Sequence, residues 1–226
     1  MELEVRIKIN SKLYLRNPEE SVLGKKIVKN GLVLINEIGF EDFTFKKLAA
    51  SIDTTEAGIY RYFENKHRFL VYLINWYWSY CEYKVVFQTN NIKDAETKLK
   101  TIIRILVEQP QEHSSTSYMC ERELYKLIMW EGSKSYLTKK VNKDNSDRIF
   151  KPYKDLCARI AQTIKEYNPK YKFPHSLSSS LIEMSHSQNF FMQNLPSLTD
   201  FKEKDEKQLI QFLESLLFNT IDKKGK

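Results

Sequence analysis

Two helix-start signals lie close together between residues 44 and 63, and this spacing constrains the fold more than any other feature. Thr44 can cap a helix through its hydroxyl. Asp53 and Glu56 have the spacing of a capping box, although that motif prefers Ser or Thr at the cap. The stretch therefore predicts two short helices in succession, the second ending near residue 63. The inward face of the first would carry Phe45, Leu48 and Ala49.

A longer helix is predicted to precede them, from about residue 19 to residue 38. Pro18 and the two acidic residues after it suit a first turn, and Gly39 stops the run. The apolar stripe of this helix consists of Leu23, Ile27, Leu34 and Ile38. Three helices of which the last two are short and joined by a tight turn make a helix-turn-helix. Such a unit places its second short helix in the major groove of DNA.

The segment "FTFKKLAASIDTTEAGIYRYFENKHRFL" resembles the DNA-binding region of the TetR/AcrR transcriptional regulators. The matching features are the aromatic residue after Gly39, the Thr-Phe-x-x-Leu-Ala run at 44–49 and the Ile-Tyr-x-Tyr-Phe run at 59–63. The resemblance covers about residues 21–70. It implies an all-α, TetR-like fold, in which a three-helix helix-turn-helix domain precedes a larger helical domain for ligand binding and dimerisation. The implied function is ligand-responsive regulation of transcription, as a repressor released from an inverted-repeat operator by a small molecule.

Two positions depart from the usual pattern of that family. Asp53 replaces the turn glycine, and Asp tolerates the left-handed backbone conformation better than most residues. Glu56 and Gly58 occupy positions of the recognition helix that present side chains to bases in other members. Glu can accept a hydrogen bond from cytosine N4, whereas glycine offers no side chain. The operator sequence therefore stays open.

The resemblance also implies which residues touch DNA. Lys and Arg neutralise phosphates, and a Tyr hydroxyl can donate to a phosphate oxygen. The expected phosphate contacts come from Thr44, Lys46, Tyr60 and Lys66, and Lys47 is also expected to bind DNA. The expected base-edge contacts come from Thr55, Glu56, Ala57, Arg61 and Tyr62. The alternatives are a solvated face for the two adjacent lysines and a core position for Tyr60, while the spacing of Phe63 from Ile59 predicts a core residue.

Beyond residue 65 the sequence is helical. Aromatic and apolar residues cover much of the predicted helix at 66–87, which is typical of a helix buried on most sides. Further helices are predicted at about 94–109, 115–131, 145–167, 176–194 and 203–221. The predicted domains are an N-terminal arm or hairpin at 1–17, the helix-turn-helix domain at 18–65 and the ligand-binding and dimerisation domain at 66–226.

The resemblance implies that the last two long helices form a homodimer and that the helical domain encloses a pocket for an unidentified small molecule. The expected dimer residues are Leu181, Met184, Phe191, Leu209, Phe212, Leu213 and Leu216. The expected pocket residues are Trp76, Tyr80, Met119 and Trp130. Intramolecular core is the alternative in both cases, because apolar residues at helical spacing pack in any helical protein.

The N-terminal arm has a different pattern. Apolar residues alternate with charged ones over residues 3–9, and Asn10-Ser11 could turn into a second short strand. A hairpin or an extended arm is predicted. Packing on its own protein is favoured over contact with DNA, since an isolated hairpin is only marginally stable.

Composition and the absence of certain motifs limit the classes of protein to which the chain can belong. The chain of 226 residues has a formal net charge of +7, which suits an anionic partner such as double-stranded DNA. No signal peptide and no membrane-spanning run is recognised, so a soluble, cytoplasmic protein is expected. No hydrolase, nucleotide-binding or metal motif occurs around the four histidines, and neither a catalytic residue, a metal nor a cofactor is predicted. There are two alternatives to a DNA-binding regulator. One is a helix-turn-helix protein that binds another protein, and the less favoured one is an enzyme whose active site lies in the helical domain.

Overall fold

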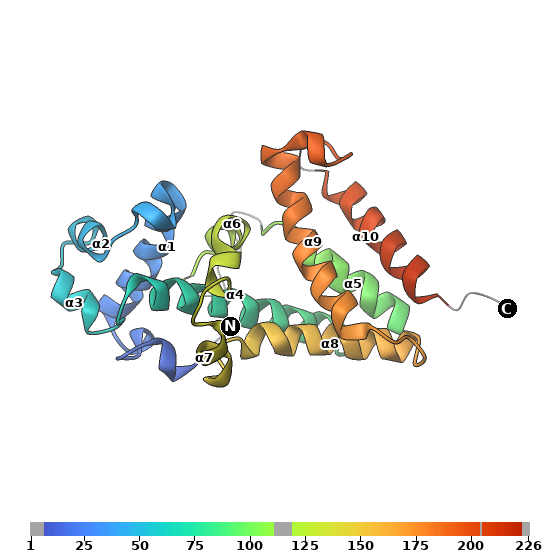
Figure 1. Cartoon of the computed structure of the whole chain (residues 1–226), viewed down its shortest axis with the longest axis horizontal. Coiled ribbons are helices and arrows are strands. Elements are labelled where there is room, and N and C mark those ends of the chain that lie inside the picture. Colours follow the sequence, from blue (N-terminus) through green and yellow to red (C-terminus); the bar gives the residue numbers. More distant parts are fainter. Residues whose placement is uncertain (1–6, 111–118, 204, 223–226) are drawn as a thin grey trace. The chain divides into compact units, whose positions relative to one another are not determined.

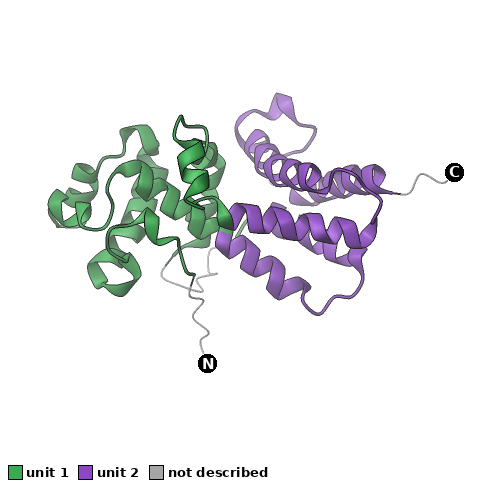
Figure 2. Cartoon of the chain, turned by 60° about the horizontal axis from the view of Figure 1, so that its bottom comes forward, with its two compact units in different colours: residues 1–78, 109–151 green, residues 79–108, 152–226 purple. Residues whose placement is uncertain are grey.

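The computed structural model describes residues 7–110, 119–203 and 205–222 (Figure 1). Over these ranges the regular elements are α-helices and short 3-10 helices, with no strand, so the predicted all-α class is confirmed. No helix in these ranges is long and apolar enough to cross a membrane. The chain divides into two compact units, drawn in Figure 2: unit 1 contains residues 1–78 and 109–151, and unit 2 contains residues 79–108 and 152–226.

Unit 1 joins the N-terminal helices to a segment from the middle of the chain. Its helices are α1 (Val22–Asp42), α2 (Phe45–Ser51), α3 (Glu56–Tyr60), the first part of α4 (Lys66–Thr89), α6 (Glu121–Glu131) and α7 (Val141–Ser146). Short 3-10 helices are η1 (Ser11–Leu13), η2 (Pro18–Glu20) and η3 (Gly132–Ser135). The packing of α6 on α1 joins this middle segment to the N-terminal helices.

Helix α1 begins and ends slightly later than the sequence indicates. The Oγ of Ser21 accepts the N–H of Gly24 at 3.0 Å and caps the helix after η2. Gly39 interrupts the helix, as the sequence predicts: its φ is +77°, which glycine adopts without a Cβ clash, and a further short helical segment follows to Asp42. The chain then leaves toward α2 at Phe43, whose N–H donates to the Gly39 carbonyl at 3.1 Å.

The predicted hairpin at the N-terminus is wrong over the residues that the structure describes. Residues 11–13 form η1 in place of a second strand, because the side chain of Asn10 accepts the Lys12 N–H and starts a helical turn. Leu13 is buried, and the N–H of Leu15 donates to the carbonyl of Tyr62 at 2.7 Å. This part of the arm therefore packs on its own chain. The predicted strand residues 3–6 lie outside the described residues.

An aromatic cluster holds the N-terminal helices of unit 1 together. Phe69 of α4 stacks on Phe43 at 5.6 Å between ring centroids and meets Phe63 edge-on at 4.9 Å. Tyr72 packs edge-on against Phe63 at 5.3 Å. Gly31 of α1 allows this arrangement, because a Cβ built there would lie 2.4 Å from Cζ of Phe69. The predicted core position of Phe63 is confirmed, and the cluster joins the segment that follows α3 to α4.

Helix α4 contains the aromatic run that the sequence predicts to be buried. Every residue from 69 to 78 is buried, so the helix is covered on all sides over that stretch, as its composition indicates. Toward its C-terminal end, Tyr83 and Phe87 are exposed. The helix contributes residues 66–78 to unit 1 and residues 79–89 to unit 2.

Unit 2 contains the C-terminal helices of the chain. They are the end of α4, α5 (Ala95–Val107), α8 (Lys151–Tyr167), α9 (Pro174–Asn194) and α10 (Glu206–Ile221), with the 3-10 helix η4 (Pro196–Leu198) between the last two. The predicted helix at 145–167 begins only at Lys151, and the earlier residues belong to α7 and a turn. Helix α9 packs on α5, and α10 packs on both (Figure 1). The side-chain amide of Asn168, which follows α8, donates to the carbonyl of Ile221 at the end of α10 at 2.6 Å and so links the ends of these two helices.

Candidate nucleic-acid interface

Helix α2 presents cations on its outer side and apolar residues on its inner side. Thr44 caps it as predicted, since its Oγ accepts the N–H of Lys47 at 3.2 Å. Phe45 and Leu48 are buried, whereas Lys46 and Lys47 are exposed. The ammonium of Lys47 donates to the carbonyl of Asp42 at 2.8 Å, so this lysine also stabilises the segment that leads from α1 into α2. Lys46 points its charge outward without such a bond among the described residues.

The turn between α2 and α3 is built around Asp53. Its φ of +51° lies in the left-handed region, which confirms the interpretation that Asp takes the place of a turn glycine. The capping box predicted from Asp53 to Glu56 is wrong. Thr55 is the cap, because its Oγ accepts the N–H of Gly58 at 3.1 Å, and the positive φ takes Asp53 out of the extended conformation that an N-cap requires.

A lysine that the sequence analysis did not single out also holds this turn. The ammonium of Lys26, on α1, donates to the carbonyl of Ile52 at 2.7 Å. This carbonyl lies at the end of α2, where backbone acceptors have no partner within the helix. Lys26 therefore fixes the position of the turn relative to α1. Lysines recur along this helix face in the sequence, so no signal distinguished this one.

Helix α3 has one buried side and one exposed side. Ile59 is fully buried and Phe63 follows it into the core. Tyr60 has its ring edge-on to Phe45 at 5.1 Å, yet 46% of the residue is exposed, which leaves its hydroxyl end toward solvent. The exposed residues along the cap, the helix and its end are Thr55, Glu56, Ala57, Tyr60 and Arg61. The structure thus brings together all but one of the expected base-edge residues on one accessible surface, which we call the α3 surface.

Tyr62 is the exception, and its expected contact with a base edge needs correction. The residue is only 2% exposed, and its hydroxyl lies 2.8 Å from the Oγ of Ser21. The guanidinium of Arg16 lies over its ring at 5.5 Å from the centroid. Tyr62 consequently anchors the N-terminal arm and the start of α1, because its side chain points into unit 1.

The expected contact of Lys66 with a phosphate also needs correction, because its ammonium binds backbone carbonyls of unit 1. Its ammonium donates to the carbonyls of Phe40, Glu41 and Phe43 at 3.0, 2.9 and 3.2 Å. A lysine ammonium has three protons, and all three are donated here. In this conformation Lys66 has no donor left for a phosphate. It caps the C-terminal end of α1 and ties it to the first residue of α4.

The same end of α1 is held from the other side by α6. Glu131, the last residue of α6, is buried and accepts the N–H of Phe40 at 3.0 Å through Oε1. Lys134 bridges the Oε2 of Glu131 at 2.7 Å and the Oε1 of Glu41 at 3.0 Å. The hydrogen bond with Glu131 raises the pKa of Lys134, and the hydrogen bond from Lys134 lowers the pKa of Glu41. Both shifts favour the ionised forms of Lys134 and Glu41.

The residues expected to line a ligand pocket are divided between the two compact units. Trp76 and Met119 are buried in unit 1 and Tyr80 is buried in unit 2. Trp130 is 57% exposed, so its expected place in an enclosed pocket needs correction. The residue lies near the end of α6 and almost opposite the buried Ile128, since two residues span about 200° around a helix.

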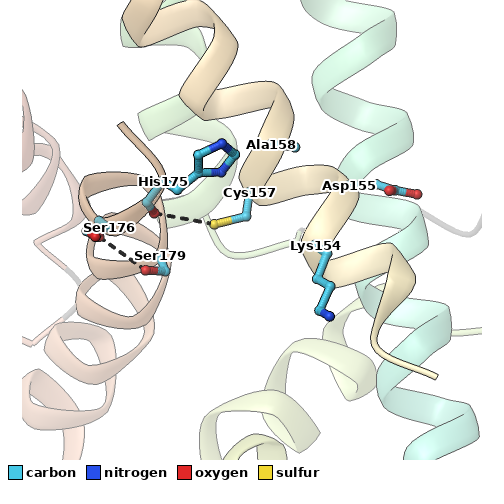
Figure 3. A pocket seen from close by; sticks show the side chains of 7 residues that line it. All are labelled: Lys154, Asp155, Cys157, Ala158, His175, Ser176 and Ser179. Atoms are coloured by element: carbon cyan, nitrogen blue, oxygen red, sulfur yellow. Dashed lines mark hydrogen bonds between the residues drawn. The ribbon is translucent and has the colours of Figure 1, made fainter. Parts of the chain in front are cut away.

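Unit 2 contains an open pocket of about 550 Å³ that the sequence analysis did not predict (Figure 3). It lies between α8 and the start of α9, and the thiol of Cys157 is 3.8 Å from the carbonyl oxygen of His175. Burial raises the pKa of this thiol, with a smaller contribution from Glu183, so the neutral form is favoured. The lining residues are Lys154, Asp155, Cys157, Ala158, His175, Ser176 and Ser179. None of the expected pocket residues is among them.

The residues expected at a dimer interface divide into two groups. Leu181, Leu209 and Leu213 are buried inside unit 2, so their expected contact with a second copy needs correction: their stripe packs α9 and α10 together. The part-exposed or exposed members are Met184, Phe191, Phe212 and Leu216. Phe212 is 39% exposed and its ring also contacts Phe201 at 5.6 Å. These four remain available on the surface of the last two helices.

Within the described ranges, no group of three or more His, Cys, Asp or Glu side chains could hold a metal ion. Comparison with known proteins points instead to nucleic acid. Residues 27–73 match the family model described as bacterial regulatory proteins, tetR family. The match includes most of α1, all of α2 and α3, and the first residues of α4. No curated protein sequence matches the chain significantly.

Several solved structures share the fold over most of this chain. A bacterial regulatory protein of the tetR family from Rhodococcus RHA1 aligns with a TM-score of 0.63 at 12% identity over 89% of this chain and 97% of its own. AibR, crystallised with isovaleryl coenzyme A and operator DNA, aligns with a TM-score of 0.60 at 16% identity over 87% and 99%. The fatty acid degradation regulator FadR from Bacillus halodurans aligns with a TM-score of 0.57 at 20% identity over 85% and 96%.

Proposed function

We propose that this chain, whose residues 27–73 form a DNA-binding domain of the tetR family, is a homodimeric transcriptional regulator that releases its operator when a small molecule binds. The observation that carries the proposal is the α3 surface, where Thr55, Glu56, Ala57, Tyr60 and Arg61 are exposed together on a short helix. The rigid aromatic core behind that helix holds it in place. A surface of this kind fits a major groove, and its flanking Lys46 fits the adjacent phosphates.

Arg61 and Tyr60 supply complementary parts of the contact. An exposed guanidinium can donate two parallel hydrogen bonds to guanine O6 and N7, which is the commonest specific contact in the major groove. The Tyr60 hydroxyl, held by the packing of its ring on Phe45, can donate to a phosphate oxygen and set the depth of the helix in the groove. Phosphate contacts position the protein, and base contacts select the sequence.

Two copies of the chain are required for useful specificity, because α3 is five residues long and reaches only a few base pairs. We place the dimer contact on Met184, Phe191, Phe212 and Leu216, which are exposed or part-exposed apolar residues of α9 and α10. A two-fold axis makes such a surface self-complementary. The operator is then an inverted repeat whose half-sites are about 34–36 Å apart or a multiple of this spacing.

The operator is released if the small molecule binds more tightly to the conformation of the dimer that cannot contact both half-sites. Helix α4 belongs to both compact units, and Glu131 joins α6 to the end of α1. Both are routes by which a change in the helical domain reaches α3. A regulator crystallised with both an acyl-CoA and operator DNA, among the proteins that this chain is similar to, supports a function with two partners. A repressor that dissociates on ligand binding is our specific proposal.

Selection of binding sites from a pool of random duplex DNA tests the proposal. The full chain is expected to enrich an inverted repeat, and Arg61→Ala is expected to change the preferred base at one position of each half-site. Compounds that raise the melting temperature are then tested for loss of affinity for the enriched duplex, since binding of one partner must alter binding of the other. No enrichment by a folded dimer would favour a helix-turn-helix that binds another protein.

A further inference from the structure

Glu56 is the one acidic residue of the α3 surface. It is the first residue of α3 and is exposed together with Ala57 and Tyr60, while Ile59 on the other side of the helix is fully buried. Lys46 and Arg61 supply the positive charge of the surrounding surface. A carboxylate at this place would be carried toward the phosphates of a bound duplex, whose charge repels it. A carboxylate in such an interface therefore needs a specific hydrogen bond to the DNA that offsets this repulsion.

The fold itself does not require this carboxylate. Thr55 already caps α3 by accepting the N–H of Gly58, so the helix does not need a carboxylate as the acceptor for its first turn. Among the described residues, none donates a hydrogen bond to the carboxylate of Glu56, and no ion pair includes it. Both of its oxygens are consequently available to a partner.

The neighbours of Glu56 on α3 leave room for a close approach. Ala57 has only a methyl group, and Gly58 has no side chain. A Cβ at residue 58 would lie 3.2 Å from the Oγ1 of Thr54 and 3.4 Å from the Oγ1 of Thr55, so glycine also keeps the capping hydroxyl uncrowded. The small residues allow the start of the helix to come near the base edges, within reach of a glutamate side chain.

The chemistry of the major groove then selects the base. Only cytosine N4 and adenine N6 offer hydrogen-bond donors there, whereas guanine and thymine present acceptors that repel a carboxylate. Adenine places its N7 acceptor beside the N6 donor, which weakens its attraction for an anion. Cytosine has no such acceptor next to N4. We propose that Glu56 is a specificity-determining residue that selects cytosine by accepting a hydrogen bond from its N4 amino group.

This inference rests on the proposed function and makes it more specific. Because the dimer presents two copies of Glu56, the required cytosine occurs once in each half-site, on the strand that faces this residue. A neutral glutamine at the same place has a different preference, since its amide can both donate to adenine N7 and accept from adenine N6. The change from carboxylate to amide therefore predicts a change of base and not merely a change of affinity.

The test uses binding-site selection with the full-length protein and three variants. The native chain is expected to enrich cytosine at one position per half-site, with about 5- to 100-fold weaker binding when that base pair is replaced. Glu56→Gln is expected to enrich adenine at that position only, and Glu56→Ala is expected to lose the preference there while keeping it elsewhere. Glu64→Gln is the matched control, because it removes an exposed carboxylate just beyond α3 and leaves every preference unchanged.

Three outcomes distinguish the inference from the function on which it rests. A shift from cytosine to adenine in Glu56→Gln supports the inference. Enrichment of the same base at every position by the native chain, Glu56→Gln and Glu56→Ala overturns it and leaves the DNA-binding function intact. Absence of any enriched sequence with the native chain overturns the DNA-binding function as well.

Discussion

The carboxylate of Glu131 accepts the backbone N–H of Phe40 at 3.0 Å, although the two residues are 91 positions apart in the sequence. This hydrogen bond connects the last turn of α6 to the residue after the Gly39 kink of α1. Lys66 holds the same end of α1 from α4. The junction from which the chain enters the helix-turn-helix is thus fixed by two side chains from elsewhere in unit 1.

Replacing Glu131 by Ala is expected to destabilise the protein. The Phe40 N–H would lose its acceptor in a buried place and Lys134 would lose an ion-pair partner. An unsatisfied buried donor costs about 1–3 kcal/mol of unfolding free energy. Urea unfolding measures this loss. Glu131→Gln keeps an acceptor oxygen and is expected to recover much of the stability; equal losses in both variants would contradict the importance of the hydrogen bond.

Replacement of Lys46 and replacement of Lys66 are expected to affect the stability of the protein differently. Lys46→Ala should leave stability within about 0.5 kcal/mol of the native value, because the residue is an exposed surface position. Lys66→Ala removes three hydrogen bonds to carbonyls of the α1–α2 junction and should lower the unfolding free energy by about 1–3 kcal/mol. Thermal and urea unfolding of the two variants side by side measures the difference. Equal stability would show that the capping by Lys66 is energetically neutral.

Phe212→Glu is expected to convert the dimer into monomers that lose operator binding while remaining helical. The side chain is 39% exposed in the single chain, so the new carboxylate can be solvated in the monomer. Across a two-fold axis it would be desolvated near its own copy, at a cost of several kcal/mol. Sedimentation and circular dichroism measure the two properties.

Phe87→Glu is the matched control for the dimer, because Phe87 is an exposed phenylalanine of unit 2 on α4 and not on α9 or α10. It is expected to stay dimeric. Leu213→Glu is not a suitable test, since Leu213 is buried inside unit 2 and the change would unfold the chain. A dimeric Phe212→Glu protein would place the interface elsewhere.

Stability is expected to fall as the pH drops below about 6.5, the usual pKa of histidine. Burial lowers the pKa of His186, against a smaller opposing effect from its hydrogen bond to the Ile182 carbonyl, and burial also lowers the pKa of His67. The unfolded chain then binds more protons than the folded chain over this window. The stability present above pH 6.5 is therefore lost on acidification, by up to about 1.4 kcal/mol per pH unit for each histidine.

Urea unfolding between about pH 7.5 and pH 5 measures this dependence. His186→Gln is expected to give a shallower slope than the native chain. His175→Gln is the control, because His175 is exposed, and it should keep the native slope. An unchanged slope in His186→Gln would show that this histidine does not contribute to the acid sensitivity.

Local signals in the sequence predicted much of the fold. The cap at Thr44, the aromatic run of α4 and the core position of Phe63 depend on neighbouring residues and helical periodicity, and each is confirmed. The Thr55 cap was assigned to Asp53, because two successive threonines and an acidic residue offer several local solutions. The N-terminal hairpin was wrong because the alternation of apolar residues at 3–9 does not continue as a strand after Asn10.

Contacts between distant segments could not be read from the sequence. Nothing near Glu131 indicates that it accepts the N–H of Phe40. Nothing near Lys26 indicates that it donates to the carbonyl of Ile52. The roles of Lys66 and Tyr62 were misassigned for the same reason, since motif position alone does not show whether a side chain points outward. The apolar stripe of α10 likewise indicated packing without indicating that Leu209 and Leu213 pack within the single chain.

The salt dependence of equilibrium binding to the enriched duplex tests the central claim most directly, namely that the α3 surface and its flanking cations bind DNA. The logarithm of the affinity should fall linearly with the logarithm of the salt concentration, because bound cations release counterions from the phosphates. Lys46→Ala should reduce the magnitude of the slope by about one. Salt-independent binding, or a slope unchanged in a folded, dimeric Lys46→Ala protein, would contradict the account.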